Sequence, residues 1–565
     1  MKNLSQIIKS IEYKSVNSDG KTEIPLSDKE ISDLVFDSRD VKPGSLFFAL
    51  PGTHTTGNVF IPSAIESGAG AVVFQDEFDE ATKSKIADAC KGKSVSFIKV
   101  ESARFAMAPV SAEYFDNPSR KLGVIGVTGT EGKSSTVSFI WQLLRLTGHK
   151  AGFISTVQFS LGDEARANPQ HTTTPESPII QNYLDEMVKN GCEYAVVETS
   201  SHGLSKKLNR TGNIDFDVGI FMNVTLEHLE FHKTFEQYRS DKANLFRKLD
   251  ENSHEKTILG KKVKIPSFGI VNLEDPSAEY FIKATRQPVM GFTTEGKAGK
   301  SAAEGTKAPL LPPVPAEIPV LTAKNIASAR YGLAFDMSEP GAVDEHSKPI
   351  PRKIFHVKSH LPGAFNTYNL MAAIETVSRL TGTPIEDVAS QVENLAPVKG
   401  RMTVIDEGQP FELVVDYAHT PSSFETIFPP LRRRCSGRMI CLFGSGGERD
   451  TKKRPLQGEI AAKFCDIVIL ADEDPRGEDP VELLKEIAVG AEKGGKVLNK
   501  DLFIIPDRPK AIREAFKMAE KNDIVLLLGK AHENSIIYKD GPHPYDEISE
   551  AKKALRELNL ENAKQ

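Results

Sequence analysis

The residues best suited to chemistry lie in residues 126–135, the stretch GVTGTEGKSS, directly after an apolar run. A strand, a glycine-rich turn and a helix start place backbone N–H groups around phosphate oxygens, with Lys133 reaching the terminal phosphates and Ser134 ligating Mg²⁺. The stretch departs from the usual G-x-x-x-x-G-K-[ST] pattern, because the first glycine would fall on Val127 and the acidic Glu131 stands inside the loop. The glycines present are Gly126, Gly129 and Gly132. We interpret the stretch as a phosphate-binding loop.

Two further stretches carry residue types that hold metal ions. The apolar run YAVVE ends in Glu198, and a carboxylate at the edge of a sheet supplies the hard oxygen ligands that Mg²⁺ requires. The stretch TLEHLEFHKTF brings His228 and His232 close together. By residue type alone, Glu198 is equally a solvated strand end, and isolated histidines are more often hydrogen-bonded than metal-bound. These candidates therefore depend on where the fold places them.

Short apolar runs alternate with amphipathic stretches along the chain, which indicates an α/β fold with mainly parallel sheets. The first unit has a strand, a helix and a strand in SLFFAL, IPSAIESG and AGAVVF. The second has strands in KLGVIGV, YAVVETS and FDVGIFMNV, and the third in FELVVDYAH, MICLFGSGG, DIVILADED and DIVLLLGKAHE. Ligands of such sheets bind at the carboxyl ends of the strands. We predict domains at 1–118, 119–396 and 397–565, with a flexible insertion at 293–319.

The composition is that of a globular protein with several domains. A chain of 565 residues is too long to fold around one hydrophobic core. The net charge of −6 argues against a nucleic-acid partner. Five scattered cysteines without C-x-x-C spacing indicate neither a disulfide framework nor a zinc site. The first residues lack a long apolar core, and no later stretch approaches the apolar length of a membrane span. We therefore expect a cytoplasmic protein.

Several motifs occur in the order found in one enzyme family. They are GVTGTEGKSS, TTTPES, ETSSHGL, NVTLEHLEFHKTFEQYRSDKANLF, GAFNTYNLMAA, DYAHTP, GSGGERDTKKRP and GKAHE. In this order they resemble the Mur ligases, most closely the MurE type, over nearly the whole chain. The resemblance implies an N-terminal uridine-nucleotide-binding α/β domain, a central P-loop ATPase domain with a mainly parallel sheet, and a C-terminal Rossmann-like domain. The rival hypotheses are a folylpolyglutamate-synthetase-like ligase, which FDSR and PGTHTTG argue against, and a non-catalytic nucleotide-binding regulatory module.

The resemblance implies ATP-dependent amide formation in peptidoglycan precursor synthesis. In the family reaction the D-glutamate carboxylate of UDP-MurNAc-L-Ala-D-Glu is phosphorylated, and the amine of a diamino acid attacks the acyl phosphate. A carboxylate is a poor electrophile until its oxygen becomes a good leaving group, and two Mg²⁺ ions with a lysine neutralise the transferring phosphoryl group. The implied ligands are ATP, Mg²⁺ and these two small-molecule substrates, and we expect a monomer.

The family's nucleotide and metal residues carry over position by position. ATP contacts are implied for Gly129, Thr130, Glu131, Gly132, Lys133, Ser134, Ser135, Asn366, Asn369, Arg401 and Asp416, with His419 beside them. Catalytic roles are implied for Lys133, Glu198, His228 and Lys242, and metal ligation for Ser134, Glu198, His228 and Lys242. Lys242 matches the lysine that CO₂ converts to a carbamate, which offers Mg²⁺ anionic oxygen where an ammonium would repel it. Thr403 stands where an acidic residue is usual.

Glu131 and Arg210 also depart from the family pattern. Glu131 stands where the family more often has Asn, and we expect its side chain to turn outward while its backbone N–H faces phosphate. Arg210 aligns with the family's arginine only when two residues within SKKLN are treated as an insertion. With Arg210, the residues implied to bind UDP-MurNAc-dipeptide are Phe36, Ser38, Thr53, His54, Thr55, Thr172, Thr173, Thr174 and Ser200.

The third domain is implied to select the incoming amino acid. The residues concerned are Arg449, Glu473, Asp474, Pro475, Arg476, Gly529 and Glu533. Arg476 and Arg449 can grip a distal carboxylate through forked bonds, which favours meso-diaminopimelate. Asp474 stands where the diaminopimelate enzymes have Asn, and its charge favours the ammonium end of L-lysine or L-ornithine, with Arg476 neutralised by Glu473 or Asp474. We favour meso-diaminopimelate and keep lysine and ornithine as alternatives.

Overall fold

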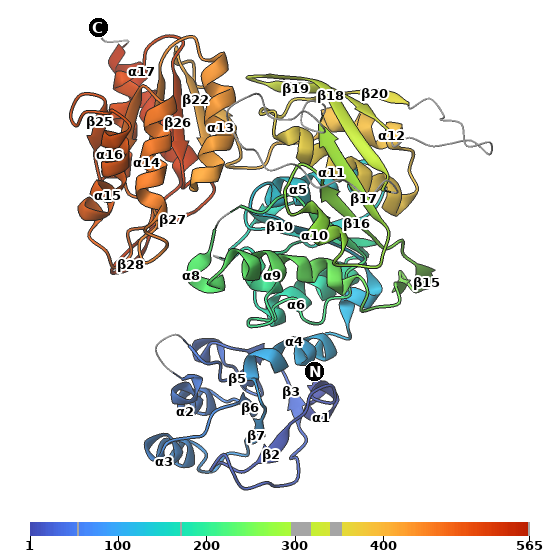
Figure 1. The fold of residues 1–565 in the computed structure, drawn as a ribbon. Helices are drawn as coiled ribbons and strands as arrows, with labels where there is room; N and C mark the ends of the chain where they lie inside the picture. Colours follow the sequence, from blue (N-terminus) through green and yellow to red (C-terminus); the bar gives the residue numbers. More distant parts are fainter. Residues whose placement is uncertain (53–55, 170–171, 226, 295–317, 340–352, 563–565) are drawn as a thin grey trace, which may run out of the picture.

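The computed structural model describes residues 1–52, 56–169, 172–225, 227–294, 318–339 and 353–562. Figure 1 shows a blue N-terminal part, a central part built on a large sheet, and an orange-red C-terminal part beyond it. The α/β alternation expected from the sequence is confirmed, and each strand that the sequence predicted is present. No helix within the described ranges is both long and apolar enough to cross a membrane.

The N-terminal part holds a sheet in the order β2-β7-β6-β5-β4. Strands β4 to β7 run parallel, and β2 lies antiparallel to β7 at the edge. The strands are β1 (Lys2–Asn3), β2 (Lys14–Val16), β3 (Glu30–Ile31), β4 (Leu34–Val35), β5 (Leu46–Phe48), β6 (Ala71–Phe74) and β7 (Ser96–Lys99). The helices are α1 (Leu4–Ile7), α2 (Ile61–Glu66), α3 (Glu80–Ala89) and α4 (Ala103–Tyr114), with short 3-10 turns η1 (Ser38–Asp40), η2 (Gly57–Phe60) and η3 (Pro118–Lys121).

The central part holds the large sheet, in the order β11-β10-β9-β12-β8-β13-β16-β17-β18-β19-β20. The strands between β9 and β18 in this order run parallel, and antiparallel strands extend the sheet at both edges. Its strands are β8 (Gly123–Thr128), β9 (Ala151–Ile154), β10 (Gln158–Ser160), β11 (Arg166–Ala167), β12 (Tyr194–Glu198), β13 (Val218–Phe221), β16 (Phe268–Asn272), β17 (Val289–Thr294), β18 (Val320–Ala329), β19 (Gly332–Ser338) and β20 (Ile354–Ser359), beside the hairpin β14 (Glu255–Ile258) and β15 (Lys261–Lys264). The helices are α5 (Lys133–Leu146), α6 (Ser177–Lys189), α7 (Ser201–Leu204), α8 (Leu229–His232), α9 (Phe235–Lys248), α10 (Ala278–Ile282), α11 (Asn366–Thr381) and α12 (Ile385–Ser390), followed by the 3-10 turn η4 (Gln391–Asn394).

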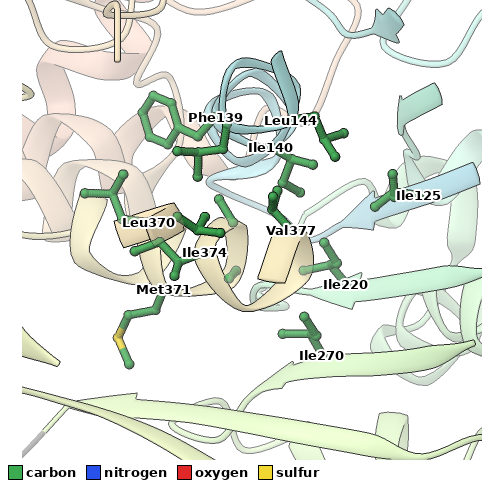
Figure 2. Close-up of a cluster of buried hydrophobic side chains, with 14 of the residues drawn as sticks. Ile125, Phe139, Ile140, Leu144, Ile220, Ile270, Leu370, Met371, Ile374 and Val377 are labelled. Atoms are coloured by element: carbon green, nitrogen blue, oxygen red, sulfur yellow. The ribbon is translucent and has the colours of Figure 1, made fainter. Parts of the chain in front are cut away.

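Helices α5 and α11 pack together on one face of this sheet, as Figure 2 shows. Buried side chains of both helices, such as Ile140 and Ile374, meet buried strand residues such as Ile125 and Ile220. Each large aliphatic side chain buried here contributes roughly 2 kcal/mol. This packing fixes the first turns of both helices relative to the carboxyl end of β8, where ligands of parallel sheets bind.

The C-terminal part holds a sheet in the order β21-β22-β26-β23-β24-β25, parallel except for β21. Its strands are β21 (Thr403–Ile405), β22 (Glu412–Asp416), β23 (Met439–Phe443), β24 (Ile467–Leu470), β25 (Leu502–Ile504) and β26 (Ile524–Leu528), beside the hairpin β27 (Ser535–Tyr538) and β28 (Gly541–Pro544). The helices are α13 (Pro421–Arg434), α14 (Lys453–Phe464), α15 (Pro480–Lys493), α16 (Arg508–Met518) and α17 (Glu547–Asn562). This is the Rossmann-like arrangement that the sequence predicted.

The predicted insertion at 293–319 needs one correction. Thr293 and Thr294 are the last residues of β17, paired with β18, so the strand continues two residues into the range assigned to the insertion. Alternating apolar and polar residues are a weak signal at a strand end, and the Gly-rich and Lys-rich run that follows obscured it. Residues 295–317 lie outside the described residues.

Candidate functional site

The phosphate-binding loop joins β8 to α5. Gly132 caps the helix with a positive φ of 83°, and a Cβ there would lie 2.6 Å from Asn369 Oδ1, so the position requires glycine. Asn223 holds the other side of the loop, because its Oδ1 accepts from the backbone N–H of Thr130 at 3.0 Å and of Glu131 at 2.8 Å. The loop is thus fixed at the N-terminus of a long helix, where the dipole and the helix N–H groups favour a phosphate.

Ser134 and Glu198 face each other at the carboxyl ends of the central strands. Ser134 Oγ donates to Glu198 Oε1 at 3.1 Å, and both residues are buried. Thr156 orients this carboxylate, donating from its backbone N–H to Oε2 at 2.8 Å and from its hydroxyl to Oε1 at 3.0 Å. Neighbouring oxygens of an octahedral Mg²⁺ shell, each about 2.1 Å from the ion, lie about 3 Å apart. The pair therefore fits Mg²⁺.

Lys133 and Lys242 both donate to carbonyl groups of the loop. Lys133 Nζ donates to Thr130 O, and Lys242 Nζ donates to Gly129 O, each at 2.7 Å. Lys242 is 2 % exposed, and its Nζ lies 4.7 Å from the ring centre of Tyr238. Burial, followed by the charge of Lys133, holds the pKa of Lys242 well below its usual range. A buried lysine with a lowered pKa supplies the neutral amine that reaction with CO₂ requires.

The two histidines of the stretch TLEHLEFHKTF have different surroundings. His228 precedes α8 with a left-handed φ of 57°, and its Nε2 lies 3.6 Å from Glu227 Oε1. His232 is buried, and its ring nitrogens are bonded to Asp241 at 2.8 Å and to Ser201 at 2.9 Å. His232 therefore braces α9 against α7 and has no ring nitrogen left for a metal. His228 stays the candidate ligand.

Glu227 is a charged residue of this site that the sequence analysis missed. Burial raises its pKa, but His228, His419 and Lys133 outweigh that effect and the pKa is lowered to about 2. Its Oε1 also lies 3.8 Å from Nε2 of His419, in the C-terminal part. An anionic residue therefore stands between the candidate metal histidine and the C-terminal part. The only signal in the sequence was its place beside His228 in TLEHL.

A cavity of about 380 Å³ opens beside the loop and reaches the C-terminal part. Asn369 lines it, whereas Asn366 lies behind, accepting from Asn369 Nδ2 at 2.9 Å and donating to Pro362 O at 2.7 Å. Asn366 therefore orients Asn369, and its own amide is used within the protein. The wall also includes residues that the sequence analysis did not identify: Asn223, Thr225, Asn272, Glu274, Phe365 and Tyr368. The volume suits a nucleotide-sized ligand.

Glu131 is placed differently from the prediction. Its side chain lines the cavity, and its Oε1 accepts from Thr420 Oγ1 at 3.3 Å, across the contact with the C-terminal part. Its backbone N–H donates to Asn223 Oδ1 at 2.8 Å. Burial, followed by the charge of Glu227, raises the pKa of Glu131 to about 7. The expected outward side chain was wrong, because the carboxylate lines the cavity and contacts Thr420 of the C-terminal part.

The loop before β21 brings Arg401 onto the central part. Arg401 Nη2 donates to Ser134 Oγ at 3.2 Å. Asp416, at the end of β22, accepts two backbone N–H groups and so fixes the loop that carries the arginine. Thr403 Oγ1 accepts from the N–H of Gly400 at 2.9 Å. Thr403 therefore supports the same turn, which accounts for a hydroxyl residue at the position where an acidic residue is usual.

Arg210, one of the residues predicted to bind UDP-MurNAc-dipeptide, lies near the contact between the first two parts. Arg210 Nη2 pairs with Glu176 Oε1 at 2.9 Å, and Glu176 also accepts from Arg104 of α4 at 3.0 Å. The hydroxyl of Thr174 accepts from the backbone N–H of Ser200 at 2.8 Å. Phe36 and Ser38 follow β4, and Thr172 and Thr173 precede α6. Thr53, His54 and Thr55 lie outside the described residues.

The predicted amino-acid residues gather at the strand ends of the C-terminal sheet. Asp474 Oδ1 accepts from Lys530 Nζ at 2.8 Å and from the N–H of Ile537 at 2.9 Å. Lys530 is fully buried and also pairs with Glu533. The negative charge of Asp474 is therefore compensated inside the protein. From the sequence, the charge of Asp474 disfavoured a ligand with a distal carboxylate. In the structure that charge is paired with Lys530.

Polar atoms at the same edge have no partner within the described residues. Arg476 Nε and Glu473 Oε2 are both buried there without a hydrogen bond, and burial raises the pKa of Glu473. Gly529 has a positive φ of 97°, and a Cβ on it would lie 2.7 Å from Glu473 Oε2. The predicted neutralisation of Arg476 by Glu473 or Asp474 is not found among the described ion pairs, in which Asp474 pairs with Lys530. Arg449 is exposed beside Gly446, and Pro475 is buried. A polar ligand fits this edge.

A phosphate loop, a position that fits Mg²⁺ and a third domain contacting the same cavity define a nucleotide-dependent enzyme. The chain matches the Mur ligase family, catalytic domain over residues 30–115, the Mur ligase middle domain over 127–377, and the Mur ligase glutamate ligase domain over 400–531. It therefore belongs to the Mur ligase family, as the motifs predicted, and is an ATP-dependent ligase of peptidoglycan precursor synthesis that uses Mg²⁺.

Named relatives resemble the chain over almost all of its length. The UDP-N-acetylmuramyl-tripeptide synthetase of Treponema denticola is 50% identical, covering 98% of both chains. The UDP-N-acetylmuramoyl-L-alanyl-D-glutamate–2,6-diaminopimelate ligase of Geobacillus kaustophilus is 34% identical, covering 94% of this chain and 95% of that protein. A solved structure of a ligase with the latter name has a TM-score of 0.55 at 24% identity, covering 97% of this chain and 100% of that one. That likeness supports the three-domain fold, and the predicted fold class is confirmed.

Proposed function

We propose that the chain joins a diamino acid to the D-glutamate of UDP-MurNAc-L-Ala-D-Glu, with ATP as the source of an acyl phosphate. The observation that carries the proposal is the cavity beside the phosphate loop, where the central and C-terminal parts meet. On one side of it lie the phosphate loop and the pair Ser134 and Glu198, and on the other lie Arg401 and the strand ends with Asp474. Two substrates held by different domains meet at such an interface. Closure of the domains excludes water from it.

The residues of the central part suit phosphoryl transfer to a carboxylate. Lys133 stands at the start of α5, and Ser134 with Glu198 would hold Mg²⁺, which neutralises charge on the transferring phosphoryl group. The substrate carboxylate oxygen takes the phosphoryl group and ADP leaves, after which the amine of the diamino acid attacks the carbonyl carbon. Phosphate then leaves and the amine proton is lost, which gives the amide.

We further propose that Lys242 becomes a carbamate. Its neutral Nζ attacks CO₂, a C–N bond forms, and one proton is released, which leaves an anionic oxygen pair near Gly129 and the phosphate loop. The support is the burial and lowered pKa of Lys242. The carbamate replaces a cationic group by a ligand that suits Mg²⁺. His228 completes the proposed ligand set.

Meso-diaminopimelate is the diamino acid that we propose. Lys530 compensates Asp474, and Arg476 has an unpartnered buried Nε, so a guanidinium remains for the distal carboxylate. L-lysine and L-ornithine lack that carboxylate and would leave the guanidinium unpaired. A monomeric state and a cytoplasmic location are our predictions from the sequence.

Coupled ATP cleavage tests the proposed function. Phosphate release is measured with ATP and Mg²⁺ alone, with UDP-MurNAc-L-Ala-D-Glu added, and with a diamino acid added as well. We expect sustained release only in the complete mixture, because the acyl phosphate stays enclosed until an amine arrives. Rapid release in the absence of both substrates would contradict the ligase and favour a nucleotide-dependent switch.

A further inference from the structure

The ring of Tyr417 is surrounded by Arg401, which reaches the phosphate-binding loop, and by two histidines. Tyr417 follows β22, and its ring centre lies 5.0 Å from Arg401 Cζ, 4.7 Å from the ring of His419 and 4.5 Å from the ring of His532. A guanidinium over an aromatic face and tilted ring pairs are both attractive arrangements. The ring is therefore held from several directions in one orientation.

The hydroxyl of Tyr417 points to the amino-acid side. It donates to Glu533 Oε1 at 3.2 Å, and the other oxygen of Glu533 pairs with Lys530. Lys530 Nζ in turn donates to Asp474 Oδ1 at 2.8 Å. Burial raises the pKa of Tyr417 well above its usual range, so the hydroxyl keeps its proton and stays a donor at neutral pH. One hydroxyl thus fixes a carboxylate predicted to bind the diamino acid.

These contacts form one continuous path. Ser134 Oγ bonds to Glu198 on one side and accepts from Arg401 Nη2 at 3.2 Å on the other. Arg401 lies against the Tyr417 ring, and the Tyr417 hydroxyl reaches Glu533. The path runs from the oxygens that fit Mg²⁺ to the strand ends of the C-terminal sheet, through one aromatic side chain.

We propose that Tyr417 is a positioning residue that couples the nucleotide side of the site to the diamino-acid side. The proposal rests on the ligase function proposed above. Arg401, engaged with the central part, fixes the ring, and the ring directs the hydroxyl that holds Glu533 in place for the substrate amine. A nucleotide that orders Arg401 thereby improves the binding of the diamino acid.

The test compares Tyr417→Phe with the wild type in the complete ligase reaction. The variant keeps the ring and loses the hydroxyl, so the KM for the diamino acid rises about tenfold, while the KM for ATP changes less than about twofold. Tyr417→Leu also loses the ring contacts, so both KM values rise. Tyr545→Phe is the matched control, because it removes a half-buried hydroxyl that donates to Glu547 at 2.5 Å in the same domain. The control keeps both KM values.

A double-mutant cycle separates coupling from general damage. Because Tyr417→Phe removes the donor and Glu533→Ala removes the acceptor of the same hydrogen bond, the double variant loses no more affinity for the diamino acid than Glu533→Ala alone. An unchanged KM for the diamino acid in Tyr417→Phe, equal rises in both KM values, or fully additive losses would each overturn the proposal. A wild type that forms no product with any diamino acid refutes the ligase function instead, which distinguishes the two failures.

Discussion

Glu131 Oε1 accepts a hydrogen bond from Thr420 Oγ1 at 3.3 Å, so the carboxylate inside the phosphate loop contacts the C-terminal part. Thr225 of the central part and Ser422 of the C-terminal part form a second contact between these domains, with 3.2 Å between their hydroxyl oxygens. The residue that looks out of place in a phosphate loop therefore joins two domains at the edge of the nucleotide cavity. The loop accommodates it because its pKa is raised to about 7 by burial and by Glu227.

Glu131→Gln is expected to tighten ATP binding at pH 8, by about tenfold, because it removes a negative charge from the cavity wall. A carboxyl with a raised pKa is mostly protonated below that pKa, so at pH 6 the wild-type side chain is nearly neutral and resembles glutamine. The advantage of the variant therefore shrinks from pH 8 to pH 6. Calorimetric titration with a non-hydrolysable ATP analogue at both pH values measures it, and taking the ratio of variant to wild type removes the titration of the nucleotide itself.

Glu425→Gln controls for the loss of one charge. Glu425 is exposed on α13 and does not line the cavity, so this variant should bind the analogue like the wild type at both pH values. Equal affinity of Glu131→Gln and the wild type at pH 8 would show that the carboxylate does not act on the phosphates.

Lys242→Ala is expected to lose at least about a hundredfold in turnover, because it removes the proposed anionic metal ligand. Short carboxylic acids added to the variant should restore part of the activity by supplying that oxygen. Lys248→Ala is the matched control, since Lys248 lies on the same helix and also donates to a backbone carbonyl, at 2.6 Å from Gly212 O. Intact-protein mass under CO₂ is a second readout. Full activity of Lys242→Ala would remove the carbamate from the mechanism.

Asp474→Asn separates the two explanations of the amino-acid site. If Asp474 serves as the partner of Lys530, the substitution lowers the free energy of unfolding by about 2 kcal/mol and leaves the ratio of kcat/KM for meso-diaminopimelate and L-lysine nearly unchanged. If instead its charge selects an ammonium, the ratio shifts toward meso-diaminopimelate without a comparable loss of stability. Steady-state kinetics with both amino acids and thermal unfolding distinguish these results.

The elements were predictable because their signals are local. The run before Gly126 has the length and apolarity of a buried strand, and Lys133 follows a glycine at a helix start, so the loop and its neighbours could be placed from the sequence. The direction of the Glu131 side chain could not be predicted in this way, because its carboxylate contacts Thr420, which is far away in the chain. The same holds for Glu227 and Tyr417, whose roles depend on contacts with residues far away in the chain.

The histidines and the acidic loop show the same limit. The spacing of His228 and His232 does not reveal that Asp241 and Ser201 occupy both ring nitrogens of the second one. The sequence EDPR shows two acidic residues beside an arginine. The positive charge that pairs with Asp474, however, comes from Lys530, which follows a different strand. Residue types in a motif are therefore visible in the sequence, whereas the pairing of their charges is set by tertiary contacts.

The most direct test of the proposed function is the mass of its product. The protein is incubated with UDP-MurNAc-L-Ala-D-Glu, ATP and Mg²⁺, and with meso-diaminopimelate, L-lysine or L-ornithine in turn. The proposed function predicts one new amide per ATP consumed, with meso-diaminopimelate as the preferred amine. Exclusive use of lysine or ornithine would contradict the assignment of Arg476 to a distal carboxylate, and the absence of any amide product with all three would contradict the ligase function itself.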